Sequence, residues 1–381
     1  MNLSTKKLLA ARSPDPRINL LRGLANWFLF LDHVPHNVVN LLTIRNFGFS
    51  GATDVFVFVA GYAAATFFGK MAQERGFVVT VTRIFRRMWQ LYAAYVVLFV
   101  IYIDIIGNVA AQYFTTEIID EYNVTGLVDH PIRTLMRGIM LQAKPLNLDT
   151  LQLFVALMAF FPLILWSVLR RPNLTLAASF ALYAAARMFD WSLPSFPSGS
   201  WYFNPFCWQL LFVLGTWFAL NGAKFTAIAH RLAWLRIAAV AYLLLAFVVT
   251  VAAHVPVIAG MVPDFGLNPL TPTDKENLAF YRVVHLLALA LLFTYLVPRY
   301  WPALRSRLLQ PVMKCGEEWL ACFCVGVFLS FAAHFILITG PASIAMQMLV
   351  SASGIAMMTG VAYYLSWSRR QDGTSVRHAE A

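Results

Sequence analysis

The segment at residues 20–34, LLRGLANWFLFLDHV, places Arg22, Asn26, Asp32 and His33 among leucines and aromatic residues. A charged group at the centre of a bilayer costs about 2.5–3.5 kcal/mol, so such groups face a protein interior or a water-filled passage. Imidazole is the most frequent general base near neutral pH, and guanidinium binds phosphate well. This combination predicts a site that holds an anionic ligand and removes a proton from a reacting group.

The spacing of these residues predicts a shared helix face. Arg22 and His33 are 11 positions apart, which on an α-helix is about 1100° of rotation and a rise of about 16 Å. Their side chains therefore point within about 20° of each other, and Asn26 falls near the same face. A long ligand could contact Arg22 with a phosphate and present a reactive group to His33. A helix that continued to residue 42 would extend this stripe through His36, Asn37 and Asn40.

Asp32 is the less certain member of the group, because it points about 100° away from His33 on a helical wheel. It orients the imidazole only if the helix is locally bent. The alternative for the whole stripe is structural, namely a buried ion pair or a row of hydrogen bonds between packed helices. Four polar residue types on neighbouring faces favour the functional interpretation.

The elements that must position these residues are membrane helices. Of the 381 residues, 60% are hydrophobic and 12% charged, whereas soluble domains carry about 25% charged residues. Apolar runs long enough to cross a core of about 30 Å recur along the chain, and they are continuous rather than alternating. We therefore predict an all-α polytopic bundle in a lipid bilayer, with spans near 19–42, 53–70, 88–107, 149–169, 174–189, 204–221, 233–254, 279–298, 316–338 and 342–366.

The distribution of basic residues predicts the orientation. Of 29 Lys and Arg residues, 21 fall in the alternate segments that include the N-terminus and 7 in the others, with Arg22 inside the first span. Basic residues concentrate on cytoplasmic loops, so both termini are predicted to be cytoplasmic. The same bias accounts for the net charge of +11 without nucleic acid. One membrane domain is expected over residues 1–370, followed by a disordered cytoplasmic tail at 371–381.

Further polar residues are candidates for ligand contacts. Arg282 and His285 lie three positions apart near the predicted outer end of the eighth span, and therefore share a helix face. A guanidinium there could bind a carboxylate through two hydrogen bonds. The alternative for Arg282 is a side chain that reaches out to the interface.

Two other sets of residues could bind a ligand or could equally have a structural role. Asn204, Trp208 and Gln209 open the sixth span, where a sugar could stack on Trp208, although Trp at a membrane boundary is more often an anchor. Three arginines before the third span could bind phosphates, although they also fit the orientation rule without a ligand; these are Arg83, Arg86 and Arg87. The sequence contains no phosphate-binding glycine loop and no metal-binding motif.

Several segments resemble a known family. Arg22, ten residues and His33 resemble the Arg-x10-His signature of the membrane acyltransferase-3 superfamily. The segment GFSGATDVFVFVAGYAAA, residues 48–65, is similar to its second-span pattern, where Asp54 and Gly61-Tyr62 fit and Ala60 replaces the usual Ser. The closer similarity is to the OpgC family, across RINLLRGLANWFLFLDHVPHN, FNPFCWQLLFVLG, TDKENLAFYRVVHLLALA and FCVGVFLSFAAH. Glu317-Glu318-Trp319 departs from the His-Ser that members tend to show there.

The resemblance implies a chemistry that composition and spacing do not. OpgC proteins transfer succinyl groups from cytoplasmic acyl-CoA to osmoregulated periplasmic glucans, which implies a bacterial inner-membrane O-succinyltransferase. Succinyl-CoA would be a donor substrate, and no permanently bound cofactor is expected. His33 and Asp32 would be catalytic, Arg22 and Asn26 would bind the donor together with the arginines before the third span, and Asp54 would join the substrate-binding residues. Acetylation of another envelope polysaccharide and transport of an anionic metabolite are the alternatives. The oligomeric state is not indicated.

Overall fold

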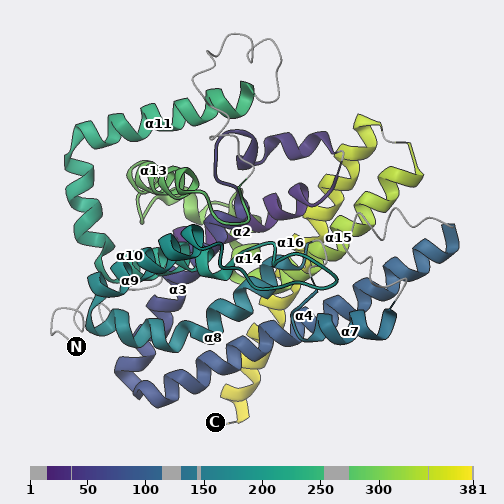
Figure 1. Ribbon diagram of the computed structural model, residues 1–381, viewed down its shortest axis with the longest axis horizontal. Coiled ribbons are helices and arrows are strands. Elements are labelled where there is room, and N and C mark those ends of the chain that lie inside the picture. Colours follow the sequence, from purple (N-terminus) through teal and green to yellow (C-terminus); the bar gives the residue numbers. More distant parts are fainter. Residues whose placement is uncertain are drawn as a thin grey trace. The chain divides into compact units, whose positions relative to one another are not determined.

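The computed structural model describes residues 15–35, 37–113, 130–143, 147–252, 274–341 and 343–379 (Figure 1). Within these residues every regular element is a helix, and extended backbone forms only isolated bridges, between Ala143 and Phe196 and between Pro194 and Ser200. This confirms the all-α class. The elements are α2 (Pro16–Asp32), η1 (Val38–Leu42), η2 (Ile44–Asn46), α3 (Ala52–Arg75), α4 (Phe77–Tyr113), α7 (Pro131–Ile139), α8 (Asp149–Arg170), α9 (Pro172–Met188), α10 (Pro205–Arg231), α11 (Ala233–Ala252), α13 (Phe280–Leu296), η4 (Pro302–Arg305), α14 (Gln310–Glu317), α15 (Trp319–Thr339) and α16 (Ile344–Ala379).

Seven helices among the described residues are long and apolar enough to cross a membrane, namely α3, α4, α8, α10, α11, α15 and α16. Helix α13 is apolar but shorter. Each of the ten predicted spans overlaps a helix, so the prediction of a helical membrane protein is confirmed in this coarse form. The number of crossings and the side on which the termini lie remain predictions.

Local sequence signals account for where several helices begin and end. Asp15 caps α2 by accepting a hydrogen bond from the Arg17 amide at 3.1 Å, and Pro16 occupies the first helical position, where its missing N–H is not needed. Helices α3 and α4 are separated by Gly76, whose φ of +84° suits glycine. Pro172 starts α9 directly after α8.

The first predicted span is wrong in its length. Helix α2 ends at Asp32 instead of residue 42, because Pro35 has no N–H to continue the helical hydrogen bonds and restricts the residue before it. Asn37 instead caps η1, accepting from the Val39 amide at 3.0 Å, and donates to Ser351 Oγ of α16 at 2.8 Å. Asn40 lies within η1, so neither asparagine extends the stripe on α2. His36 lies outside the described residues.

The chain forms two compact units, and α3, α10 and α13 contribute residues to both. The first unit contains Ala60–Phe225 and the described part of Pro272–Val283. Within it, α8 packs against α4 and α9, and α7 packs against α4. Gly61 allows close approach of α3 and α10, because an added Cβ would lie 2.0 Å from the Phe212 carbonyl oxygen.

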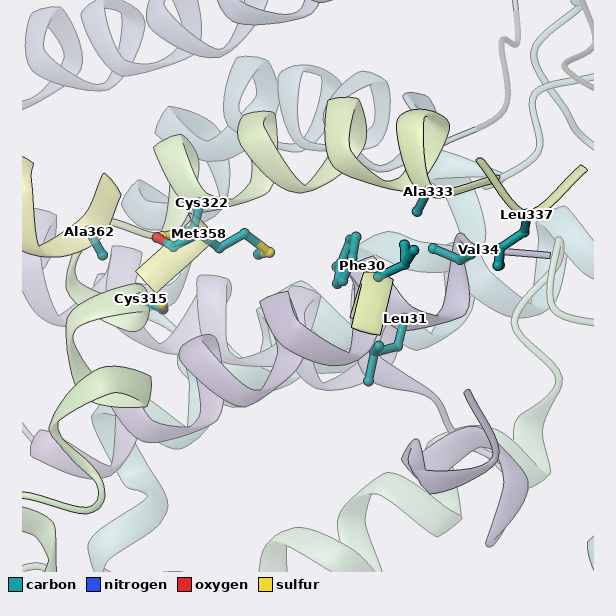
Figure 2. Packing of buried hydrophobic residues seen from close by; sticks show 10 residues of the cluster. Phe30, Leu31, Val34, Cys315, Cys322, Ala333, Leu337, Met358 and Ala362 are labelled. Carbon is teal, nitrogen blue, oxygen red and sulfur yellow. The ribbon is translucent and has the colours of Figure 1, made fainter. Parts of the chain in front are cut away.

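The second unit contains Ser13–Val59, the described part of Thr226–Thr271, and Val284–Ala381. Its centre is α2, which packs against α14, α15 and α16. Figure 2 shows Phe30 and Val34 near Ala333 and Leu337 of α15, with Cys315, Cys322 and Met358 at the other end of the same apolar cluster. This core fixes the helix that carries the predicted stripe.

Helix α16 spans Ile344–Ala379 and so enters the segment at 371–381. The predictions of one domain over residues 1–370 and of a disordered tail at 371–381 both stay predictions.

Candidate functional site

Two polar residues of the stripe on α2 meet the start of α15. The guanidinium carbon of Arg22 lies 5.8 Å from the centre of the Trp319 ring, within the range of a cation–π contact. Asn26, one turn further along α2, donates from Nδ2 to the Trp319 carbonyl oxygen at 3.2 Å. The indole ring of Trp319 also packs edge-on against Phe56 of α3, at 5.4 Å between ring centres. Trp319 therefore orients both residues of the stripe.

The two polar atoms of the Asn26 carboxamide differ in their contacts. Nδ2 donates a hydrogen bond, whereas Oδ1 accepts none from the described residues. Asn26 is only 1% exposed, and its Oδ1 accepts no hydrogen bond from the described residues. Leaving a buried carbonyl oxygen unsatisfied costs about 1–3 kcal/mol, so such groups usually serve water or a ligand. Because Nδ2 is held by a backbone carbonyl, Oδ1 presents an acceptor to any N–H donor that enters beside α2.

His33 follows the last residue of α2 and is half-buried. Its backbone N–H donates to the Leu29 carbonyl oxygen at 3.1 Å, so the residue still continues the helical path that carries Arg22 and Asn26. Arg22 and Asn26 therefore lie on α2 and His33 directly follows it, and a common face for the three side chains stays a prediction.

Asp32 is held by the loop that follows α2. Its Oδ1 accepts from Thr43 Oγ1 at 2.6 Å and lies 3.2 Å from Arg45 Nε. These contacts tie the end of α2 to residues 43–45. The predicted role of Asp32 in orienting His33 stays a prediction.

Asp54 stabilises the beginning of α3. This fully buried carboxylate accepts from the Gly51 amide at 2.8 Å, which is the geometry of an acid in the first turn that caps its own helix. The residue before this glycine, Ser50, contacts His285 of α13, with 2.6 Å between Ser50 Oγ and His285 Nδ1. Asp54 thus fixes the loop in which a hydroxyl meets an imidazole.

The remaining predicted site residues on α13 and α4 belong to the first unit. Arg282 is 4% exposed, so the guanidinium is buried and does not extend to the surface as an interfacial arginine would. The arginines of α4 are more accessible, since Arg83 and Arg86 are exposed and Arg87 donates to Gln90 Oε1 at 3.0 Å. Binding of an anion by these groups stays a prediction.

Asn204, Trp208 and Gln209 all hold structural hydrogen bonds in the first unit. Asn204 caps α10, Trp208 donates from Nε1 to the Lys275 and Glu276 carbonyl oxygens at 3.1 Å, and Gln209 pairs with Ser179. The Trp208 ring has no exposed surface, so it presents no face to a membrane boundary or to a sugar. A part in substrate binding stays a prediction for the three residues.

A family model described as OpgC protein matches residues 14–370. The chain belongs to the OpgC family. No curated protein and no solved structure matches the chain. OpgC membership indicates a transferase with acyltransferase-type function on glucans, and the long apolar helices agree with the membrane association of the family.

In this OpgC protein, the departure at Glu317-Glu318-Trp319 has a structural explanation. Glu318 stands between α14 and α15, is buried, and forms an ion pair with Arg369 of α16. Trp319, the next residue, makes the contacts with Arg22 and Asn26. At this position the chain therefore has two structural residues. Glu318 links to α16, and the indole of Trp319 orients Arg22 and Asn26.

Two site residues were not singled out from the sequence of this OpgC protein. Trp319 stands out in the sequence only as part of a departure from the family pattern, and Ser50 lies within GFSGATD, where Asp54 and the glycines carry the resemblance. A signal for Ser50 is present in the sequence, because the glycines at 48 and 51 leave room for another side chain to approach the backbone near this serine. The contact with His285 is 235 positions away in the chain, and one sequence does not reveal it.

Proposed function

We propose that this OpgC protein is an inner-membrane O-succinyltransferase that transfers succinyl from succinyl-CoA to hydroxyl groups of a periplasmic glucan. The observation that supports it best is the arrangement on α2. Arg22 and Asn26 are oriented by Trp319, and the same helix leads to His33. The three residues supply an anion-binding group, an amide acceptor and a general base along one helix.

The donor fits the order of these groups. Its phosphates would bind near Arg22. The pantetheine arm carries two amides, and one N–H would donate to Asn26 Oδ1, which accepts no hydrogen bond within the described part of the chain. The thioester would then extend toward His33, about 16 Å from Arg22 along an ideal helix.

His33 would act as the general base. It would take the proton of a glucan hydroxyl as the oxygen attacks an acyl carbonyl. In direct transfer, that carbonyl is the thioester of the donor, so the new C–O bond forms, the C–S bond breaks and the CoA thiolate leaves. With an acyl-enzyme, His33 would act in the second of two steps. General-base catalysis contributes about 10²- to 10⁴-fold to a rate.

Analysis of cell-envelope glycans tests the proposal against its two alternatives. Glycans would be extracted from cells with and without the protein and examined by mass spectrometry. We expect succinyl substituents on the periplasmic glucan only when the protein is present. Acetyl groups on a different polysaccharide would support acetyltransfer, and unchanged glycans with altered metabolite flux would support transport.

Replacement of Arg282 tests how the donor is selected. We expect Arg282→Ala to lower succinyl transfer more than acetyl transfer, because succinyl ends in a carboxylate that a buried guanidinium would bind. Hydrogen bonds to charged groups contribute about 1.5–3 kcal/mol, so the succinyl-to-acetyl ratio should fall roughly 10- to 100-fold. A ratio measured in one preparation does not depend on the amount of folded protein. Equal loss for both donors would remove the carboxylate-binding role.

A further inference from the structure

Ser50 and His285 form a buried hydroxyl–imidazole pair in the second unit. Ser50 Oγ lies 2.6 Å from His285 Nδ1, and the backbone N–H of Ser50 donates to the same nitrogen at 3.3 Å. An N–H donor requires an unprotonated acceptor, so Nδ1 carries the lone pair and the second ring nitrogen carries the proton. The hydroxyl of Ser50 is therefore the donor and His285 is the base. This is the polarity of an activated nucleophile.

The loop before α3 encloses the imidazole on several sides. A Cβ added at Gly48 would lie 2.1 Å from His285 Nε2, so only glycine permits this backbone to pass the ring. The ring centres of Phe49 and Tyr242 lie 5.8 and 6.4 Å from that of the imidazole. Close packing on these sides fixes the ring orientation.

Burial of the pair suits transfer rather than hydrolysis. Ser50 is 0% and His285 3% exposed, so bulk water does not reach the hydroxyl in this arrangement. An ester formed at Ser50 would persist until an acceptor displaced it, because a site closed to water prevents hydrolysis of a reactive intermediate. Entry of a thioester requires residues 47–51 to move away from α13.

We propose that Ser50 is a catalytic nucleophile that carries the acyl group as an ester, with His285 as its base. This proposal rests on the transfer from acyl-CoA proposed above. In the first step Ser50 Oγ attacks the thioester carbonyl and His285 Nδ1 takes the hydroxyl proton. The C–O bond forms, the C–S bond breaks, and CoA leaves as its thiolate, which takes a proton from water.

The second step returns Ser50 to its starting state. A glucan hydroxyl attacks the ester carbonyl and transfers its proton to His33. The bond between the carbonyl carbon and Ser50 Oγ breaks, and His285 returns its proton to Ser50 Oγ. His33 then releases its proton to water. The sum is acyl-CoA plus glucan hydroxyl giving acylated glucan and the CoA thiol, because the proton that His33 releases to water replaces the one that the thiolate takes from it.

The test uses purified full-length protein with succinyl-CoA and no acceptor. We expect one equivalent of CoA to be released rapidly per chain, measured with a thiol reagent, and succinyl to appear on the peptide that contains Ser50. Ser50→Ala should show neither, and His285→Gln should form the ester at least 100-fold more slowly. Ser50→Cys should form a thioester that neutral hydroxylamine cleaves. Ser353→Ala, which removes a serine hydroxyl bonded to the Val350 carbonyl oxygen within α16, is the matched control and should behave as wild type.

His33→Gln separates the two steps. This variant should release CoA and accumulate the Ser50 ester, yet transfer nothing to glucan. Transfer to glucan by wild-type protein without CoA release in the absence of acceptor would overturn the nucleophile and leave the proposed function intact. Wild-type transfer to glucan by Ser50→Ala would also overturn the role of Ser50 as nucleophile and leave the proposed function intact. Absence of any glucan acylation by wild type would instead defeat the proposed function, while the labelled peptide still decides the role of Ser50.

Discussion

Replacement of His33 by glutamine is expected to abolish acyl transfer to glucan. Glutamine keeps hydrogen-bonding capacity and comparable size but cannot take a proton near neutral pH, so the loss should be about 10²- to 10⁴-fold in kcat. The fold should survive the change. His33 is half-buried, and the contact that continues the helix is made by its backbone N–H to Leu29, which glutamine retains.

The measurement is turnover of succinyl-CoA with glucan by protein in detergent or nanodiscs, at equal amounts of folded chain. His230→Gln is the matched control, because this histidine pairs with Thr294 Oγ1 at 3.2 Å and has no assigned part in catalysis. We expect the control to retain wild-type turnover. If His33→Gln also retained it, the general base would have to be another group and the assignment of α2 as the catalytic helix would be lost.

The sequence predicts the helices well because the residues that form and end each helix are close together in the chain. Apolar runs, Gly76 and Pro172 define the helices and the breaks between them, and each of these signals is local. The same local reasoning failed at the first span. The polar residues near 37 and 40 fit a helical wheel, but Pro35 prevents the helix from continuing to them.

The candidate site was predictable only where it follows one helix. Arg22, Asn26 and His33 are related by helical spacing; α2 carries the first two, and His33 follows its last residue. The partners that orient them come from distant segments. Trp319 and the pair of Ser50 with His285 depend on packing between helices, which no local periodicity encodes. Asp54 caps α3 through the Gly51 amide, and its predicted part in substrate binding stays a prediction.

The packing that positions α2 leads to the second large expected effect, which is destabilisation by Gly23→Ala. An added Cβ at Gly23 would lie 1.9 Å from the Val312 carbonyl oxygen, and one at Gly316 would lie 1.8 Å from the Asn19 carbonyl oxygen. Helices α2 and α14 therefore meet backbone to backbone at two glycines, as small residues permit in membrane bundles. A backbone carbonyl cannot rotate away as a side chain does, so the helices must separate, at a cost of roughly 1–3 kcal/mol or more.

Gly360→Ala provides a control of opposite sign. Gly360 also lies within a helix, α16, but a Cβ there would meet nothing within 4 Å. Alanine at this site should stabilise the protein by up to about 1 kcal/mol through helix propensity alone. Thermal unfolding of the purified variants should therefore give a Tm below that of wild type for Gly23→Ala and at or above it for Gly360→Ala.

Since Arg22 adjoins Gly23, separation of α2 from α14 should also reduce donor binding. A Gly23→Ala variant with wild-type stability would show that α2 and α14 do not pack backbone to backbone in the membrane.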